Sequence, residues 1–318
     1  MTENAILVVG SINYDLIVTQ QRLPRRGETL VASGLRGDFG GKGANQAVQA
    51  ARLGASVRFV GAAGTDDYGR RCTENLERAG VSCRLLRTTA PTGLGIVHVV
   101  GHGEVHATIV EGANGEVDAA WVQASREAFD GAAAVVLQNE IPVSANARAA
   151  ELATSIGVPV FYNAAPARPV PRGFIGSCAW LIVNEDEAAA YLERDLGDAH
   201  DDDAMRRAVQ ELRSWGADVV LTLGSRGCYV AAGREVEFVP AVATVAVDTT
   251  GAGDSFIGAF TAAIVDGSAP FDAARTAARV AAITVGGIGA QSSMPTREVL
   301  QSEVLRQASA DPGARCAG

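Results

Sequence analysis

The stretch that decides the fold is Val-Asp-Thr-Thr-Gly-Ala-Gly-Asp-Ser-Phe-Ile-Gly-Ala-Phe, residues 247–260. The preceding run, 242–247, is rich in β-branched residues and predicts a strand, whereas the apolar segment 256–265 has helical spacing. Glycines at such a junction let the backbone approach a ligand and leave the first helical amides without intrahelical acceptors. The stretch therefore predicts an α/β unit whose helix begins at an anion-binding turn.

Asp254 lies at the start of this predicted helix, where the helix dipole stabilises an ionised carboxylate. A carboxylate beside a cluster of amides can take a proton from a nucleophile while the amides hold the charge that develops. The alternative is a plain glycine-rich turn in which Asp254 only stabilises the helix start. Both interpretations are compatible with the stretch taken alone.

The composition is that of an ordinary globular protein, with 318 residues of which 47% are hydrophobic and 20% charged. This length suits one large α/β domain or two smaller ones. The net charge of -9 and the pI near 5.0 argue against general binding to nucleic acid or acidic membranes. We expect no signal peptide and no membrane span. Five scattered cysteines without a Cys-x-x-Cys pair favour reduced thiols in the cytoplasm.

The first apolar run, residues 5–10, is typical of a buried parallel strand. Asn13 and Asp15 follow it, at the end of the strand where ligands bind in open α/β sheets. No Gly-x-Gly-x-x-Gly follows this strand, so a nicotinamide dehydrogenase is set aside. Residues 16–36 alternate polar and apolar side chains, which predicts a half-exposed hairpin.

A second glycine-rich segment, residues 40–53, opens a predicted Ala-rich helix. It is not a Walker A motif, because residue 36 is Arg instead of Gly and residue 43 is Gly instead of Ser or Thr. Lys42 is the only lysine among the 27 Lys and Arg residues of the chain and lies in this segment, which favours a function for it. With the side-chain amide of Asn45, the segment suits the hydroxyl groups of a polar small molecule.

Residues 93–110 form another alternating region, which contains His98, His102 and His106. Spacing by four on a helix would suggest a zinc site. The alternation and the two glycines between these histidines favour a β-hairpin over metal binding.

From residue 117 onward, predicted strands and helices alternate, which implies a parallel sheet between layers of helices. The acidic run 201–203 is expected to be the N-cap and first turn of one of these helices. Several polar residues follow predicted strands, and each alone is compatible with a cap or a turn. Because the carboxyl ends of parallel strands meet at one edge of a sheet, they jointly predict a binding site there: Glu140, Asn163, Asn184, Glu187 and the turn 224–227.

Six motifs, in the same order along almost the whole chain, resemble the PfkB family of carbohydrate kinases, and its ribokinase branch in particular. They are Gly-Ser-Ile-Asn-Tyr-Asp (10–15), Gly-Gly-Lys-Gly-Ala-Asn-Gln-Ala (40–47), Asn-Glu-Asp-Glu (184–187), Thr-Leu-Gly-Ser-Arg-Gly (222–227), Asp-Thr-Thr-Gly-Ala-Gly-Asp (248–254) and Gly-Ala-Gln-Ser-Ser-Met-Pro (289–295). The resemblance implies a three-layer, Rossmann-like α/β domain over 1–11, 39–90 and 111–307. It also implies a small β-sheet lid at 12–38 and 91–110, and residues 308–318 are expected to be a disordered tail.

The resemblance further implies transfer of a phosphoryl group from ATP to the primary hydroxyl of a furanose sugar, with D-ribose, phosphorylated at its 5-hydroxyl, as the expected substrate. Asp254 would be the general base, and the amides of Gly251, Ala252 and Gly253 would form the anion hole, in agreement with the physical interpretation above. The sugar would be bound by Asn13, Asp15, Gly41, Lys42, Asn45, Glu140 and Asp254.

The same resemblance implies a nucleotide and two kinds of metal ion. The nucleotide would be bound by Asn184, Thr222, Gly224, Ser225, Gly227 and Gly253. Mg²⁺ would lie near Asn184 and Glu187, largely through water, since Mg²⁺ sheds its waters reluctantly. A monovalent cation, usually K⁺, would lie at Asp248, Thr250, Thr284, Gly287, Gly289 and Ser293. The lid would pair with that of a second subunit, which predicts a homodimer.

This sequence also departs from the family pattern. Ala278 and Arg279 stand where relatives often carry Asn or His near the adenine, and Tyr14 is bulkier than the residue common there. The nearest alternative is a kinase of the same family for fructose, deoxyribose or adenosine, because pocket shape separates similar substrates. From another class, a non-catalytic sugar-binding protein could share this fold. Asp254 distinguishes the two classes, since a binding protein needs no base.

Overall fold

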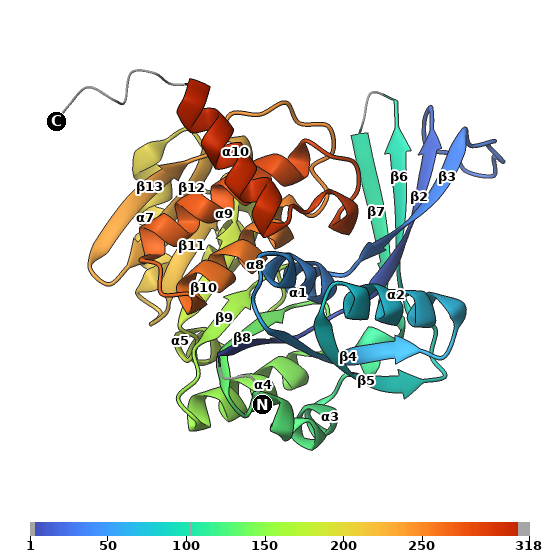
Figure 1. The fold of residues 1–318 in the computed structure, drawn as a ribbon. Helices are drawn as coiled ribbons and strands as arrows, with labels where there is room; N and C mark the ends of the chain where they lie inside the picture. Colours follow the sequence, from blue (N-terminus) through green and yellow to red (C-terminus); the bar gives the residue numbers. More distant parts are fainter. Residues whose placement is uncertain (1–3, 102–103, 311–318) are drawn as a thin grey trace.

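A computed structural model of the protein describes residues 4–101 and 104–310, and a nine-stranded sheet forms its centre (Figure 1). The seven strands from β11 to β5 are parallel, whereas β12 and β13 add an antiparallel edge. The order across the sheet is β13 (Glu235–Pro240), β12 (Gly227–Ala232), β11 (Asp218–Thr222), β10 (Trp180–Asn184), β9 (Val160–Asn163), β8 (Ala132–Gln138), β1 (Ala5–Val9), β4 (Val57–Gly64) and β5 (Val81–Thr88).

Helices cover both faces of this sheet and bury two apolar clusters. Along β1, Leu7 and Val9 belong to one cluster while Ile6 and Val8 belong to the other, because successive side chains of a strand point to opposite faces. The first cluster is covered by α3 (Ala119–Ala124), α4 (Val143–Ser155), α5 (Arg172–Gly176), α6 (Glu185–Leu192) and α7 (Asp202–Arg213). The second is covered by α1 (Lys42–Arg52), α2 (Asp67–Arg78), α8 (Ala252–Val265) and α9 (Pro270–Val285), with α10 (Arg297–Ala310) beside α9.

A separate four-stranded sheet projects beside the main body, in the order β3 (Gly34–Gly40), β2 (Asn13–Gln20), β6 (Gly93–Val100), β7 (Glu104–Val110) (Figure 1). We call it the lid sheet. Both predicted hairpins occur in it, since β2 pairs with β3 and β6 with β7, each antiparallel. The predicted fold class, a helix-sandwiched parallel sheet with a small β-sheet lid, is confirmed.

The histidines of the lid sheet lie on strands. His98 pairs across the hairpin with His106, while His102 lies outside the described residues. Within the described ranges, no group of three or more His, Cys, Asp or Glu side chains is placed to hold a metal ion. Across the same ranges, no helix is both long and apolar enough to cross a membrane.

The structure contradicts one prediction of local secondary structure. The strand predicted at 242–247 is wrong: β13 ends at Pro240, and the segment is irregular, with Val245 83% and Val247 58% exposed. β-Branched residues favour a strand only where a neighbouring strand supplies hydrogen bonds and packing, and here Val247 N donates to Val285 O of α9.

The predicted C-terminal tail begins inside a helix. Helix α10 continues to Ala310, so the first three residues of the predicted tail are helical, and residues 311–318 lie outside the described part. Asp201 is the N-cap of α7, as predicted, and accepts a hydrogen bond from Ala204 N at 2.9 Å. The domain boundaries proposed from the sequence stay predictions.

Candidate active site

Helix α8 begins as the opening motif predicts, at an N-cap glycine in the left-handed conformation. Gly251 has φ 77°, and a Cβ on it would lie 2.9 Å from the Cβ of Ala290. Only glycine accepts both the positive φ and this close approach. Of the predicted anion-hole amides, that of Ala252 makes a long bond to Thr249 O at 3.3 Å. Gly253 lies on the wall of a cavity, and a Cβ there would meet no atom within 4 Å.

Asp254 is held between α8 and α1 by two side-chain amides. Its Oδ2 accepts from Asn45 Nδ2 at 2.9 Å and its Oδ1 from Gln46 Nε2 at 3.0 Å. The carboxylate is 8% exposed. Because both donors are neutral, they orient the carboxylate without placing a formal positive charge on it. Both oxygens of Asp254 are thus oriented by side chains at the start of α1. We call residues 40–46, which contain predicted sugar-binding residues, the sugar loop.

The amides that hold Asp254 are themselves held by further amides, and sequence reasoning missed most of these. Gln46 Nε2 also lies 3.2 Å from Asn163 Oδ1, and Gln46 Oε1 accepts from Gln138 Nε2 at 2.7 Å. Asn45 Oδ1 accepts from Gln291 Nε2 at 2.9 Å. Asn163, which ends β9, was already predicted at this edge of the sheet, and the signal for Gln46 was its position directly after Asn45 in the glycine-rich motif. The network fixes the two donors in one orientation.

Gly41 lets the sugar loop approach the end of β1. It has φ 88°, and a Cβ on it would lie 2.7 Å from Asn13 N and 2.9 Å from Ile12 Cα. Asn13 is buried, and its Oδ1 accepts from Asn114 Nδ2 at 2.8 Å. Asn114, a residue that sequence reasoning missed, also bonds both backbone groups of Ile12. The predicted residues Asn13 and Gly41 therefore lie side by side.

Charged groups of the predicted sugar site interact closely. Glu140 Oε2 accepts from Ser11 Oγ at 2.6 Å and from Lys42 N at 2.9 Å. Burial would lower the pKa of Lys42, but the carboxylates of Asp254, Glu140 and Glu187 outweigh it and raise the pKa above its ordinary value. The ammonium group of Lys42 is therefore held charged among these three carboxylates.

Asp15 has the most displaced pKa of the site carboxylates. Burial, followed by the negative charges of Asp38, Glu140 and Asp254, raises its pKa from 3.8 to about 7. A hydrogen bond from the Gly95 backbone opposes the shift. Asp15 in the free protein thus changes its protonation near neutral pH, where its capacity to accept hydrogen bonds from hydroxyl groups changes with it.

We expect this shift to make the stability of the protein fall with pH relative to Asp15→Asn. In the unfolded chain Asp15 releases its proton near pH 4, whereas in the folded protein it retains the proton to about pH 7. Between these pH values the folded state binds more protons than the unfolded state, so its stability falls as the pH rises. The free-energy advantage of Asp15→Asn should therefore grow from about pH 4 to pH 7 and then level off. Urea unfolding across this range measures it, with the exposed Asp203→Asn on α7 as control. A constant difference would contradict the raised pKa.

A cavity of about 480 Å³ lies against the start of α8, within the range typical of small-molecule sites. Small apolar side chains form much of its wall, and they include Ala278, which differs from the residues that the family pattern often has near the adenine. Arg279 lines a different hollow, against α10. The structure gathers all six predicted nucleotide residues on the wall of the first cavity, namely Asn184, Thr222, Gly224, Ser225, Gly227 and Gly253.

Asn184 and Glu187 form a capping box at the start of α6. Glu187 N donates to Asn184 Oδ1 at 2.8 Å, and Asn184 N donates to Glu187 Oε2 at 2.9 Å. Burial raises the pKa of Glu187, although the Asn184 backbone and Lys42 act in the opposite direction. The two predicted Mg²⁺ residues thus have a structural role already. A carboxylate and an amide oxygen are also donors that suit Mg²⁺.

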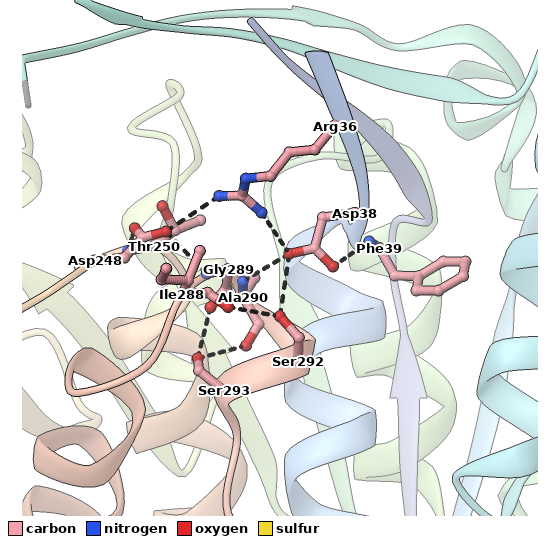
Figure 2. A network of polar contacts seen from close by, with 10 residues as sticks. All are labelled: Arg36, Asp38, Phe39, Asp248, Thr250, Ile288, Gly289, Ala290, Ser292 and Ser293. Atoms are coloured by element: carbon pink, nitrogen blue, oxygen red, sulfur yellow. Dashed lines mark hydrogen bonds and ion pairs between the residues drawn. The ribbon is translucent and has the colours of Figure 1, made fainter. Parts of the chain in front are cut away.

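The predicted cation residues lie mainly in one loop region, where the 3-10 helix η4 (Gln291–Ser293) follows α9 (Figure 2). Asp248 Oδ2 accepts from Gly289 N and its Oδ1 from Thr250 N, each at 2.9 Å. Ser293 Oγ donates to Gly289 O. Gly287 packs against Ser293, since a Cβ on it would lie 2.6 Å from the Ser293 Cβ. The Thr284 hydroxyl donates to Val280 O within α9 at 3.0 Å.

Asp254 and Asp248, the two aspartates of the stretch 247–260, make different contacts. Asp254 is bonded to Asn45 and Gln46 of the sugar loop. Asp248 is bonded to the 250 and 289 backbone and pairs with Arg36 at 3.4 Å. Burial would raise the pKa of Asp248, but the hydrogen bonds from Thr250 and Gly289 and the charge of Arg36 bring it below its usual value.

Comparisons with known proteins agree with this geometry. A family model described as pfkB family carbohydrate kinase matches residues 3–297. The chain is 35% identical to a ribokinase of Bacillus subtilis over 298 residues, 93% of this chain and 98% of that one. It is 38% identical to a ribokinase of Schizosaccharomyces pombe over 302 residues, 92% of this chain and 95% of that one.

Among solved structures, that of Arabidopsis thaliana ribokinase complexed with ribose and ATP matches with a TM-score of 0.86 and 33% identity. The match covers 95% of this chain and 98% of that one. The resemblance noted from six sequence motifs therefore extends to the whole fold. This chain belongs to the pfkB family of carbohydrate kinases.

Proposed function

We propose that this protein transfers the γ-phosphoryl group of ATP to the primary 5-hydroxyl of D-ribose, giving ribose 5-phosphate and ADP. One observation carries the proposal: Asp254 is bonded to Asn45 and Gln46 of the sugar loop and directly follows Gly253 on the wall of the cavity. A single buried carboxylate thus adjoins both the hydroxyl-binding side chains and the cavity proposed for the nucleotide. The ribokinase relatives support ribose and ATP as the substrates.

In the proposed reaction, Asp254 takes the proton of the sugar hydroxyl as its oxygen attacks the γ-phosphorus. The bond from that phosphorus to the β,γ-bridging oxygen breaks, and ADP leaves with the electron pair. The amides of Gly251, Ala252 and Gly253, at the start of α8, would hold the charge that the transferring group carries. The roles of Asn13, Asp15, Lys42 and Glu140 would be to bind and orient the substrates, since each buried hydroxyl needs a partner.

Two kinds of metal ion belong to the proposal. Asn184 and Glu187 would hold Mg²⁺ through water, and the ion would neutralise charge on the phosphates. The oxygens of Asp248, Thr250, Gly289 and Ser293, residues joined by hydrogen bonds, would form an all-oxygen donor set, as K⁺ requires. Gly287 could contribute only its backbone carbonyl, whereas the Thr284 hydroxyl, which donates to Val280 O, keeps lone pairs that could bind the ion.

Steady-state phosphorylation of a substrate panel tests the proposed function. The panel contains D-ribose, 2-deoxyribose, fructose and adenosine, each with ATP and Mg²⁺. We expect the highest kcat/KM for D-ribose. A strong preference for fructose or adenosine would show that ribose is not the substrate, although the protein would still be a kinase. Sugar binding without turnover of any substrate would instead favour the non-catalytic protein.

We expect turnover to rise when K⁺ replaces Na⁺ at constant ionic strength. The proposed cation site includes Asp248 and Thr250, which directly precede the start of α8, so a bound ion would order the anion hole. Initial rates in KCl and NaCl measure this. Equal rates in both salts would contradict a cation site that acts on the reaction.

We also propose a homodimer that forms through the lid sheet, and a cytoplasmic location. The lid sheet exposes Val105 and Ile109, which share one face of β7, and exposed apolar side chains on a sheet favour a partner surface. Light scattering at micromolar concentration measures the oligomeric state, and a monomer there would contradict the dimer.

The cysteines of the described ranges are all free thiols, which suits the reducing compartment of the proposed cytoplasmic location.

A further inference from the structure

Two side chains of lid strand β3 reach across to the loop that carries the proposed cation site (Figure 2). Arg36 Nη2 lies 3.4 Å from Asp248 Oδ2, and Arg36 Nη1 lies 3.6 Å from Asp38 Oδ2. Asp38 Oδ2 in turn accepts from Ala290 N at 3.2 Å and from Ser292 Oγ at 3.4 Å. We call Arg36, Asp38 and Asp248 with these loop contacts the lid clasp. It joins segments about 210 residues apart in the chain.

The lid clasp depends on the backbone conformation of the loop as well as on an ion pair. Gly289 has φ 86°, and a Cβ on it would lie 2.1 Å from Asp38 Oδ2 and 2.4 Å from Ser292 Oγ. The loop can therefore approach the lid only with glycine at this position. Asp38 is buried, and its Oδ1 accepts from Phe39 N at 2.8 Å, which fixes the carboxylate on the strand. Contacts of this kind hold a charge pair far better than two free surface side chains do.

The charge of Arg36 lies beside the carboxylate that the proposed cation would use. Asp248 is the one carboxylate in the proposed cation site, and its Oδ2 accepts from Gly289 N and faces Arg36. A monovalent cation at Asp248 would therefore sit beside a guanidinium group. Like charges at such a separation repel, and solvent screens this repulsion only in part, because the side chain of Asp248 is 19% exposed and that of Arg36 40%.

We propose that Arg36 is a tethered cation at Asp248, which supplies part of the positive charge that K⁺ would supply and thereby weakens K⁺ binding. The inference rests on the proposed cation site, and it deepens that proposal by naming a lid residue that tunes it. Because β3 runs on through Gly40 into the sugar loop, the position of the lid and the occupancy of the cation loop become linked. Such linkage is reciprocal for the two binding free energies.

A K⁺ titration of Arg36→Gln tests the proposal. The first readout is the thermal unfolding midpoint without substrate, in KCl mixed with tetramethylammonium chloride at constant ionic strength. We expect the K⁺ concentration at half-maximal stabilisation to fall about fivefold or more, the lower end of usual coupling between sites. Arg36→Lys, which keeps the charge, should remain close to the natural protein. Arg26→Gln, which removes an exposed charge from the same lid, is the matched control.

The second readout is the K⁺ concentration that gives half-maximal ribose phosphorylation, which should shift in the same direction. An Arg36→Gln protein that unfolds cooperatively only when K⁺ is present would also support the proposal. Equal K⁺ midpoints for Arg36→Gln, Arg26→Gln and the natural protein would overturn it, as would the absence of any K⁺ response in all of them. If no variant phosphorylates any sugar while the unfolding midpoints still differ as expected, the kinase proposal fails and the tethered cation stands.

Discussion

Asp254→Asn is expected to lower turnover by about 10²- to 10⁴-fold, the usual contribution of a general base. Sugar affinity should change little, because the amide keeps the size of the carboxylate and one of its acceptor oxygens. The carboxylate accepts from Asn45 on one oxygen and from Gln46 on the other. The new NH₂ group must face one of these donors, so we also expect a stability loss of about 1–3 kcal/mol for the unmatched pair.

Separate measurements of kcat and of the ribose dissociation constant distinguish these effects. Calorimetric titration with ribose in the absence of nucleotide gives the affinity, and thermal unfolding gives the stability loss. The matched control is Asp266→Asn, the same chemical change at the exposed C-cap of the same helix. Turnover by Asp254→Asn at the natural rate would show that the sugar hydroxyl needs no base from this position.

Gly41→Ala should disable the sugar loop through its backbone. The added Cβ would lie 2.7 Å from Asn13 N and 2.9 Å from both Ile12 Cα and Ser11 O, and none of these backbone atoms can rotate away. The positive φ costs a further amount, about 1–2 kcal/mol for a residue with a Cβ. With about 1–3 kcal/mol for the overlap, the strain should move the loop away from Asn13. We expect the ribose dissociation constant to rise at least about tenfold.

Gly27→Ala is the control that separates overlap from backbone conformation. Gly27 has φ 76°, close to that of Gly41, but a Cβ on it would meet nothing within 4 Å. Ribose titration and thermal unfolding of both variants then isolate the steric part. We expect Gly27→Ala to lose some stability and to retain its sugar affinity. Equal loss of ribose affinity in both variants would contradict a specific role of the Gly41 approach.

Local sequence signals predicted the local structure well. The N-cap at Asp201, the glycine turn at Gly251 and the β6–β7 hairpin are set largely by interactions within a few residues, so propensity and spacing suffice. The six residues predicted for the nucleotide also lie together on one cavity wall. That grouping follows from the rule that parallel strands share a carboxyl edge.

Where a partner from elsewhere in the chain decides the outcome, sequence reasoning failed or was silent. Residues 242–247 are rich in β-branched side chains, yet no described strand pairs with them, and residues 242–244 and 246 of this irregular segment line the cavity. Gln46 and Asn114 were overlooked because their partners, Asp254 and Asn13, are distant in sequence. Propensity describes one segment at a time, whereas these bonds depend on how segments pack.

The sequence by itself determined the α/β fold class, the glycine turn that opens α8 and the presence of a carboxylate at its start. It did so because periodicity, glycine placement and capping act over one or two turns of chain. Only the tertiary structure decided what each charged group does. Packing placed Asp254 between two amides, raised the pKa of Asp15 to about 7 by burial among other carboxylates, and set Arg36 against Asp248. Electrostatic energy depends on the distances between charges and on their burial in three dimensions, and neither quantity can be derived from the order of the residues.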